Sequence, residues 1–215
     1  MRADVGDDDS LWKPMPGYFA PGTPLYTEEG GDIFKGPRKL DAAKRLLGES
    51  GYAGEPVTLM AAQDIPGYKA WGDLTVDLLK RLDMKVDLAA LDLGTVIARW
   101  LQKSPPRQGG WQMLVISGNG ILASDPSGNF LRADSNTYAN GWANNPQIEA
   151  EIAAWYSATS LDAEKTIAQR LNRLAVDHVL YAPLGAYLLH YAWRKNVNSI
   201  VQAPLPLFWG VSKTA

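Results

Sequence analysis

Between residues 56 and 117 the sequence alternates between short β-type runs and longer helical patterns, and this order constrains the fold more than any other feature. Three short segments have the composition expected of strands: 56–61, 84–89 and 111–117. Apolar residues recurring at steps of three and four predict helices between them, over 67–83 and 93–102. This order predicts an α/β domain with a mixed sheet, helices on both faces and right-handed crossovers.

The segment that leaves the third strand is the expected binding region. Residues 111–117 form a nearly unbroken apolar run, which predicts a central strand buried on both faces. Residues 118–145 follow, rich in Gly, Asn, Ser and Asp, and they are too many for an ordinary connection. Ligands of open α/β sheets lie beyond the carboxyl ends of the strands, so the loop after Ser117 is the expected place.

The rest of the chain divides into a lobe and two irregular arms. Ile148 and Ile152 mark one further helix, Ile167 and Leu171 mark another, and residues 183–190 are an expected last strand. Residues 1–39 and 191–215 are rich in proline and aromatic residues and lack periodicity. We therefore expect an arm over 1–39, an α/β ligand-binding lobe over 40–190 and a C-terminal arm over 191–215.

Composition excludes several classes of function. The 215 residues carry a net charge of −2 without a long basic run, which argues against a nucleic-acid partner. There is no cysteine, so disulfides, thiolate nucleophiles and cysteine-based zinc sites are absent. No apolar run has the length of a membrane span. The acidic start, Met1 to Asp7, has no signal-peptide core and taken alone predicts a cytoplasmic protein.

Residues 40–52 read as one short, self-contained amphipathic helix. Asp41 is the expected N-cap, because its carboxylate can accept from the open N–H groups of the first turn. Ala43, Leu46 and Leu47 make an apolar stripe at helical spacing. Gly51 supplies the left-handed residue that ends the helix.

The same stretch carries the first phrase of a family resemblance. Its Ala-Lys-Arg-Leu-Leu and Glu-Ser-Gly-Tyr are similar to a signature of the extracytoplasmic solute-binding proteins of peptide/nickel-type ABC transporters, bacterial solute-binding family 5. Further phrases follow in the family's order, from 37 to about 199: Leu78 to Val86, Gly110 to Met113, Asp125-Pro126, Asn145-Pro146 and Ala182-Pro183.

The resemblance implies a carrier rather than a catalyst. The family fold is a two-lobed clamp of the periplasmic-binding-protein type II class, which closes on a solute and presents it to a membrane permease. This chain would be the C-terminal lobe, lacking the N-terminal lobe and the export signal, with its C-terminal arm returning toward the other lobe. The implied partners are a small-molecule or peptide solute and an ABC permease, and the implied location is the periplasm.

One departure from the family bears on the solute. Peptide-binding members carry Trp-x-x-Asp before the Asp-Pro turn, and that Asp pairs with the amino terminus of the peptide. The corresponding positions here are Asn119 and Leu122. An apolar side chain does not neutralise a buried ammonium, which argues against a free-amine peptide. A sugar, an opine-like compound, a metal chelate and a capped peptide stay open.

The candidate ligand-binding residues lie in the loop that leaves the third strand. Asn119, Asp125 and Asn129 offer polar groups, and Tyr138 and Trp142 offer rings for stacking. The alternative is structural, because Asp125-Pro126 also reads as a turn initiator and asparagines such as Asn129 cap turns.

We expect no catalytic residues, no metal site and no cofactor. The only histidines, His178 and His190, make a poor metal pair, and the sequence around Ser117 has no nucleophile elbow and no phosphate loop. A small hydrolase on an α/β scaffold is therefore disfavoured. The main alternative to solute binding is an interaction domain whose exposed aromatic arms pair with a partner chain or form a homodimer.

Overall fold

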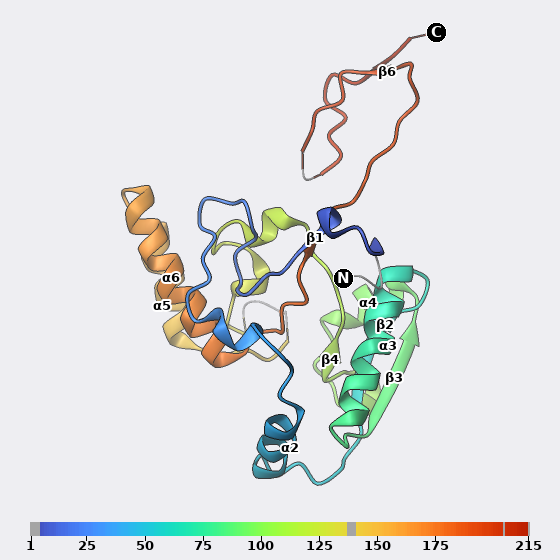
Figure 1. The fold of residues 1–215 in the computed structure, drawn as a ribbon, viewed down its shortest axis with the longest axis vertical. Helices are drawn as coiled ribbons and strands as arrows, with labels where there is room; N and C mark the ends of the chain where they lie inside the picture. Colours follow the sequence, from blue (N-terminus) through green and yellow to red (C-terminus); the bar gives the residue numbers. More distant parts are fainter. Residues whose placement is uncertain (1–4, 137–140, 204, 215) are drawn as a thin grey trace.

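The computed structural model describes residues 5–136, 141–203 and 205–214. Figure 1 shows a sheet with its helices on one side of the molecule and a pair of long helices, α5 and α6, on the other. The N-terminal segment runs between them, and the C-terminal segment projects away from both. The two halves have separate hydrophobic cores.

The main sheet has three parallel strands and confirms the α/β class. The strands are β2 (Val57–Ala62), β3 (Val86–Leu91) and β4 (Met113–Leu114), in the order β3-β2-β4. Val57 pairs with Val86, and Leu59 pairs with Met113. Antiparallel pairing occurs apart from this sheet, in the short ladders of β1 (Trp12–Lys13) with β5 (Ala186–Tyr187) and of β6 (Val197–Asn198) with β7 (Ser212–Lys213).

The prediction that residues 111–117 form the central strand is wrong. Among the described strands β2 is central, with residues 58–62 buried, whereas β4 has two residues and lies at an edge. Trp111 and Val115 are apolar because they pack into the protein, Trp111 against Trp142 and Val115 into the core cluster of the sheet. The Gln112 and Val115 N–H groups also bond to β2, at the Thr58 and Met60 carbonyls. An edge strand whose flanking residues pack into the protein thus gives the same apolar run as a doubly covered strand. The expected strand 183–190 likewise shortens to β5.

The sheet is covered by the two helices of its crossovers, α3 (Pro66–Arg81) and α4 (Leu93–Trp100). Trp71 of α3 joins Leu59 and Val115 in the core of the sheet. Gly72 lets α3 approach closely, since a Cβ there would lie 2.6 Å from the Cβ of Ala61. These contacts hold the N-terminal half of α3 against the carboxyl ends of β2 and β4.

The second core is built by α5 (Pro146–Tyr156), α6 (Leu161–His178) and the N-terminal segment. Asn145 caps α5 and Ser160 caps α6 through their side-chain oxygens. Tyr18 and Phe19 are fully buried against these helices, together with Ile148, Leu171 and other residues of the cluster. The proline-rich N-terminal segment is therefore a part of this core, entering it between the 3-10 helices η1 (Asp9–Leu11) and η2 (Gly31–Phe34).

The buried side chain of Asn172 in α6 holds the N-terminal segment in place through two hydrogen bonds. Its side-chain Oδ1 accepts from the Tyr18 N–H at 2.7 Å, and its Nδ2 donates to the Glu29 carbonyl at 2.6 Å. Gly17 makes room for this contact, because a Cβ there would lie 2.6 Å from Oδ1.

Helix α2 (Leu40–Glu49) stands apart from both cores (Figure 1). Its N-cap is Lys39 without a side-chain cap, so the predicted capping role of Asp41 is wrong; Asp41 lies within the first turn, where its charge still favours the helix dipole. Gly51 has the predicted left-handed backbone, at φ +83°. No residue of α2 is buried, and Leu46 is 57% exposed.

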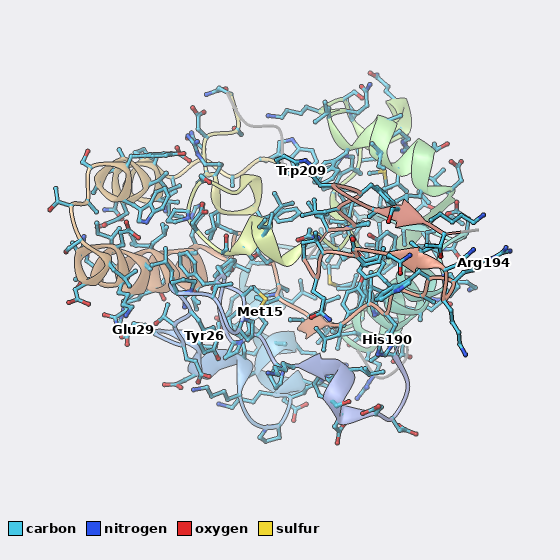
Figure 2. All side chains as sticks on the ribbon, turned by 90° about the horizontal axis from the view of Figure 1, so that it is seen from above. Met15, Tyr26, Glu29, His190, Arg194 and Trp209 are labelled. Atoms are coloured by element: carbon cyan, nitrogen blue, oxygen red, sulfur yellow. The ribbon has the colours of Figure 1, made fainter. Side chains whose placement is uncertain are left out.

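The C-terminal segment also exposes apolar side chains. Phe208 is 79% exposed and Trp209 is 88% exposed. Figure 2 shows Trp209 and Arg194 on this segment, and Tyr26 and Glu29 on the N-terminal segment. No described helix has both the length and the apolar character to cross a membrane.

Candidate functional site

Three hydroxyl groups meet at the carboxyl end of the parallel sheet. Tyr68 comes from the first turns of α3, Ser117 from the chain leaving β4, and Tyr187 from β5. The Tyr68 and Ser117 hydroxyl oxygens are 2.8 Å apart, and the Ser117 and Tyr187 hydroxyl oxygens are 3.1 Å apart. We call these residues the hydroxyl cluster. All three side chains are half-buried, so the cluster lies at the boundary between core and solvent.

The local sequence explains why Tyr68 reaches this edge. Pro66 occupies the first turn of α3, where a missing N–H costs nothing. Tyr68 and Trp71 are three residues apart and share one helix face, and helical side chains lean toward the N-terminus. Both therefore point back toward the end of the sheet.

An aromatic wall supports the hydroxyl cluster. The Trp71 ring lies 5.4 Å from the Tyr68 ring and 5.5 Å from the Tyr187 ring, the second pair edge to face. Trp71 is only 3% exposed, and its indole nitrogen has no hydrogen-bond partner among the described atoms. The wall is held on its other side by the core of the sheet.

The surroundings of the cluster are nearly free of charge. The three segments that contribute the cluster, 63–68, 116–124 and 186–188, contain one acidic residue, Asp64, and no Lys, Arg or His. The exposed Lys13 of β1 lies opposite Ala186 in the paired strand. The Asp64 carboxylate accepts from the Leu93 N–H at 2.9 Å, which ties the end of β2 to the start of α4. Asp92 caps α4, and the hydrogen bonds from the Thr95 hydroxyl and N–H hold the pKa of Asp92 below its usual value.

The loop after Ser117 is compact. It contains the 3-10 helices η4 (Gly120–Ala123) and η5 (Asn129–Leu131). Two glycines permit close approaches that a side chain would block: a Cβ at Gly118 would lie 2.2 Å from the Phe130 ring, and one at Gly128 would lie 1.9 Å from the Leu122 carbonyl oxygen. These two glycines of the loop are therefore explained by its tight folding.

The predicted site residues have different surroundings. Asn119 is half-buried and caps η4, accepting from the Ile121 N–H at 3.0 Å. Asp125 accepts from the Ser127 N–H at 2.8 Å, the geometry of the turn initiator considered for it. Asn129 begins η5, and Tyr138 lies outside the described residues. Trp142 is 46% exposed and packs edge to face on Trp111 at 4.6 Å. A ligand-binding role for these five residues stays a prediction.

Sequence reasoning missed the hydroxyl cluster. Its members are separated by 49 and 70 residues, and no short motif joins them. The available signals were weak: Tyr68 follows a proline at an expected helix start, and Ser117 ends an expected strand. Tyr187 reaches this edge on β5, which pairs with β1, and a two-residue strand leaves no periodicity to read.

Two surface hollows lie away from the cluster. A broad open depression of about 730 Å³ runs along α5 and α6 and includes Glu29, Glu151, Arg170 and Arg173. Its charges are paired, Arg170 with Glu151 at 2.8 Å and Arg173 with Glu29. A smaller hollow of about 320 Å³ lies beside Ala133, Asp134 and Glu149. Within the described residues, no group of three or more His, Cys, Asp or Glu side chains is arranged to hold a metal ion.

The comparisons with known proteins agree on one fold. No family model matches the sequence. A protein of Sinorhizobium fredii, described as a probable peptide ABC transporter periplasmic-binding protein, is 26% identical over 214 residues, covering 99% of this chain and 40% of that protein. The substrate-binding protein CtaP of Listeria monocytogenes superposes with a TM-score of 0.71 at 16% identity, over 86% of this chain and 37% of that one.

A dipeptide-binding protein from a Pseudoalteromonas species, solved with Met-Leu, has a TM-score of 0.71 at 16% identity, over 95% of this chain and 41% of that one. The fold is that of the ABC-transporter substrate-binding proteins. The family resemblance predicted from the sequence is confirmed. This chain spans about two fifths of the length of these substrate-binding proteins. Their descriptions name solute binding, which gives no support to the alternative of a dimerisation domain.

Proposed function

We propose that the chain is one lobe of an extracytoplasmic solute-binding protein that serves an ABC importer, and that it acts as a carrier rather than as an enzyme. The observation that carries the proposal is the hydroxyl cluster at the carboxyl end of the sheet, built by three distant segments and left half-buried. Ligands of open α/β sheets bind at this edge.

The exposed apolar side chains support a lobe that packs against a neighbour. Ile97 and Leu101 near α4 are 53% and 64% exposed, and Leu46, Phe208 and Trp209 are exposed elsewhere. Ile97 and Leu101 are four residues apart on one helix face and Phe208 and Trp209 are adjacent, and contiguous exposed apolar side chains mark interaction faces. In the proposal this chain is the C-terminal lobe, the N-terminal lobe covers these residues, and the C-terminal segment returns to it.

The proposed mechanism is hinged closure around the solute. The open lobe offers one wall of the site, and the facing lobe supplies the second wall and excludes water. One wall alone makes part of the contacts, so the binding measured with this chain is expected to be weak. The closed form then docks on a membrane permease from the periplasmic side.

The class of ligand is tested by calorimetry and thermal shift. This chain, and the product that includes any in-frame sequence encoded upstream, are titrated with di- and tripeptides, capped peptides, oligosaccharides, opines and nickel–histidine chelates. The proposal expects binding of one of these solutes, and tighter binding by the longer product. Binding of nucleotides or catalytic cofactors instead, with no response to any solute in the panel, would contradict it.

A further inference from the structure

The geometry points to a neutral, polyhydroxylated solute, of the saccharide class, bound at the hydroxyl cluster of Tyr68, Ser117 and Tyr187. This inference rests on the proposed function and narrows it, because it names the residues of this lobe that meet the solute and the chemistry that they accept. Three features of the site favour such a solute: the hydrogen-bonding capacity of the cluster, the wall behind it and the lack of a compensating charge beside it.

Hydroxyl groups are suited to hydroxyl ligands. Each of the three side chains can donate one proton and accept on its oxygen lone pairs, so the cluster can reverse the direction of its hydrogen bonds when a solute arrives. The spacings of 2.8 and 3.1 Å place the three oxygens in one connected chain. A vicinal diol presents the same mixture of donors and acceptors, and it can extend such a chain without leaving a polar atom unpaired.

The wall behind the cluster fixes its geometry. Trp71 contacts both tyrosine rings and is nearly fully buried, so the two phenol groups cannot swing freely away from Ser117. A site whose donors are held in place loses less entropy on binding than a mobile one. Ile121 and Leu122 of η4 follow Ser117 in the same loop, and both side chains are exposed. They offer an apolar surface of the kind on which the C–H faces of sugar rings pack.

The charge around the cluster selects against ionic solutes. The segments that contribute the cluster contain no basic side chain. Lys13 lies opposite Ala186 in the β1–β5 ladder, one position from the Trp12–Tyr187 pair, so its side chain projects from the other face of the ladder from Tyr187. The one acidic side chain of these segments, Asp64, is bonded to the Leu93 N–H at the start of α4 and not to the hydroxyl cluster. Desolvating an ammonium or a carboxylate without a counter-charge costs several kcal/mol, whereas hydroxyls exchange water for protein partners at little cost.

The test compares neutral and zwitterionic probes on the whole chain. Isothermal titration calorimetry measures stachyose, maltotetraose and sorbitol as neutral probes, and trialanine as the charged probe. We expect at least one neutral probe to bind and trialanine to bind at least about tenfold more weakly. Tighter binding of trialanine, with no neutral binding, would overturn this inference while leaving the proposed function in place. Failure of the entire solute panel would overturn both.

Three variants remove single hydroxyls and keep the packing: Tyr68→Phe, Tyr187→Phe and Ser117→Ala. Each is expected to weaken the binding of the neutral probe by about threefold to tenfold, the worth of one neutral hydrogen bond. Tyr156→Phe is the matched control, because Tyr156 is 61% exposed at the end of α5, and it should bind unchanged. Ser117→Thr keeps the hydroxyl and should retain binding even if Ser117→Ala fails to fold. Unchanged binding in folded hydroxyl-free variants would overturn the inference.

Discussion

At the scale of single residues, buried polar side chains decide which segments belong together. Asn172 is the clearest case, since it is fully buried and bonds to two backbone groups of a segment more than 140 residues away. A buried amide is tolerated only when its partners are present. The position of the N-terminal segment therefore depends on one side chain of α6.

We predict that Asn172→Ala lowers the free energy of unfolding by about 2–3 kcal/mol, because the buried Tyr18 N–H loses its acceptor and the Glu29 carbonyl loses a donor. Urea denaturation measures the change. Gln169→Ala, at an exposed position of the same helix, is the control and should shift the stability by less than about 0.5 kcal/mol. Equal effects of the two variants would refute the role given to Asn172.

At the scale of elements, short loops and helix caps position the edge of the sheet at which the site lies. Helix α4 begins after its N-cap Asp92, whose carboxylate accepts from the Thr95 N–H. The Asp64 carboxylate, just after β2, accepts from the Leu93 N–H at the same helix start. The two acidic residues therefore hold the carboxyl edge of the sheet in register with α4. An N-cap such as Asp92 is recognisable in a sequence, but a hydrogen bond between distant residues, such as that of Asp64 with Leu93, is not.

The cap at Asp92 gives a pH dependence with a definite sign. Hydrogen bonds from Thr95 lower the pKa of Asp92 below 3.8, so its contribution to stability is present above the unfolded value and is lost as the pH falls through the folded value. Asp92→Asn keeps an N-cap acceptor but does not titrate. In urea denaturation at neutral pH and below pH 3.8, we expect the wild type to lose more stability on acidification than Asp92→Asn. Parallel losses would contradict this assignment.

Elements were predictable from sequence where the pattern is local. Residues 67–83 were expected to be helical and form α3 over Pro66–Arg81, and residues 84–89 were expected to be a strand and form β3 over Val86–Leu91. The errors lie where tertiary contacts decide. The apolar run at 111–117 predicts a central strand, but its strand β4 lies at the edge of the sheet. The sequence predicts Asp41 as the N-cap of α2, but Lys39 is at that position. The hydroxyl cluster could not be predicted, because it joins three elements through pairings that no periodicity reveals.

At the scale of the whole molecule, the chain has two cores and several uncovered apolar faces. The core of the sheet and the core around α5 and α6 each close on themselves. The C-terminal segment projects from both (Figure 1), and its Phe208 and Trp209 side chains are exposed. The proposed role as one lobe of a two-lobed protein accounts for the uncovered apolar faces.

This arrangement predicts a contrast between two substitutions. The double change Phe208→Ser and Trp209→Ser should leave the free energy of unfolding within about 0.5 kcal/mol of the wild type and should lower the binding of a hydrophobic dye, because both side chains are already exposed. Ile152→Ala, at a position 2% exposed, should cost about 2–4 kcal/mol. A large loss of stability in the double variant would mean that the C-terminal segment packs on this chain itself.

The most direct test of the account maps the solute onto the chain by NMR. Backbone amide shifts of the isotopically labelled chain are followed while the solute that binds best in the calorimetric panel is added. We predict that the largest changes fall on Tyr68, Ser117, Asn119 and Tyr187, at the carboxyl end of the sheet. Changes confined to the depression along α5 and α6, with the sheet edge unaffected, would contradict the claim that this lobe holds its solute there.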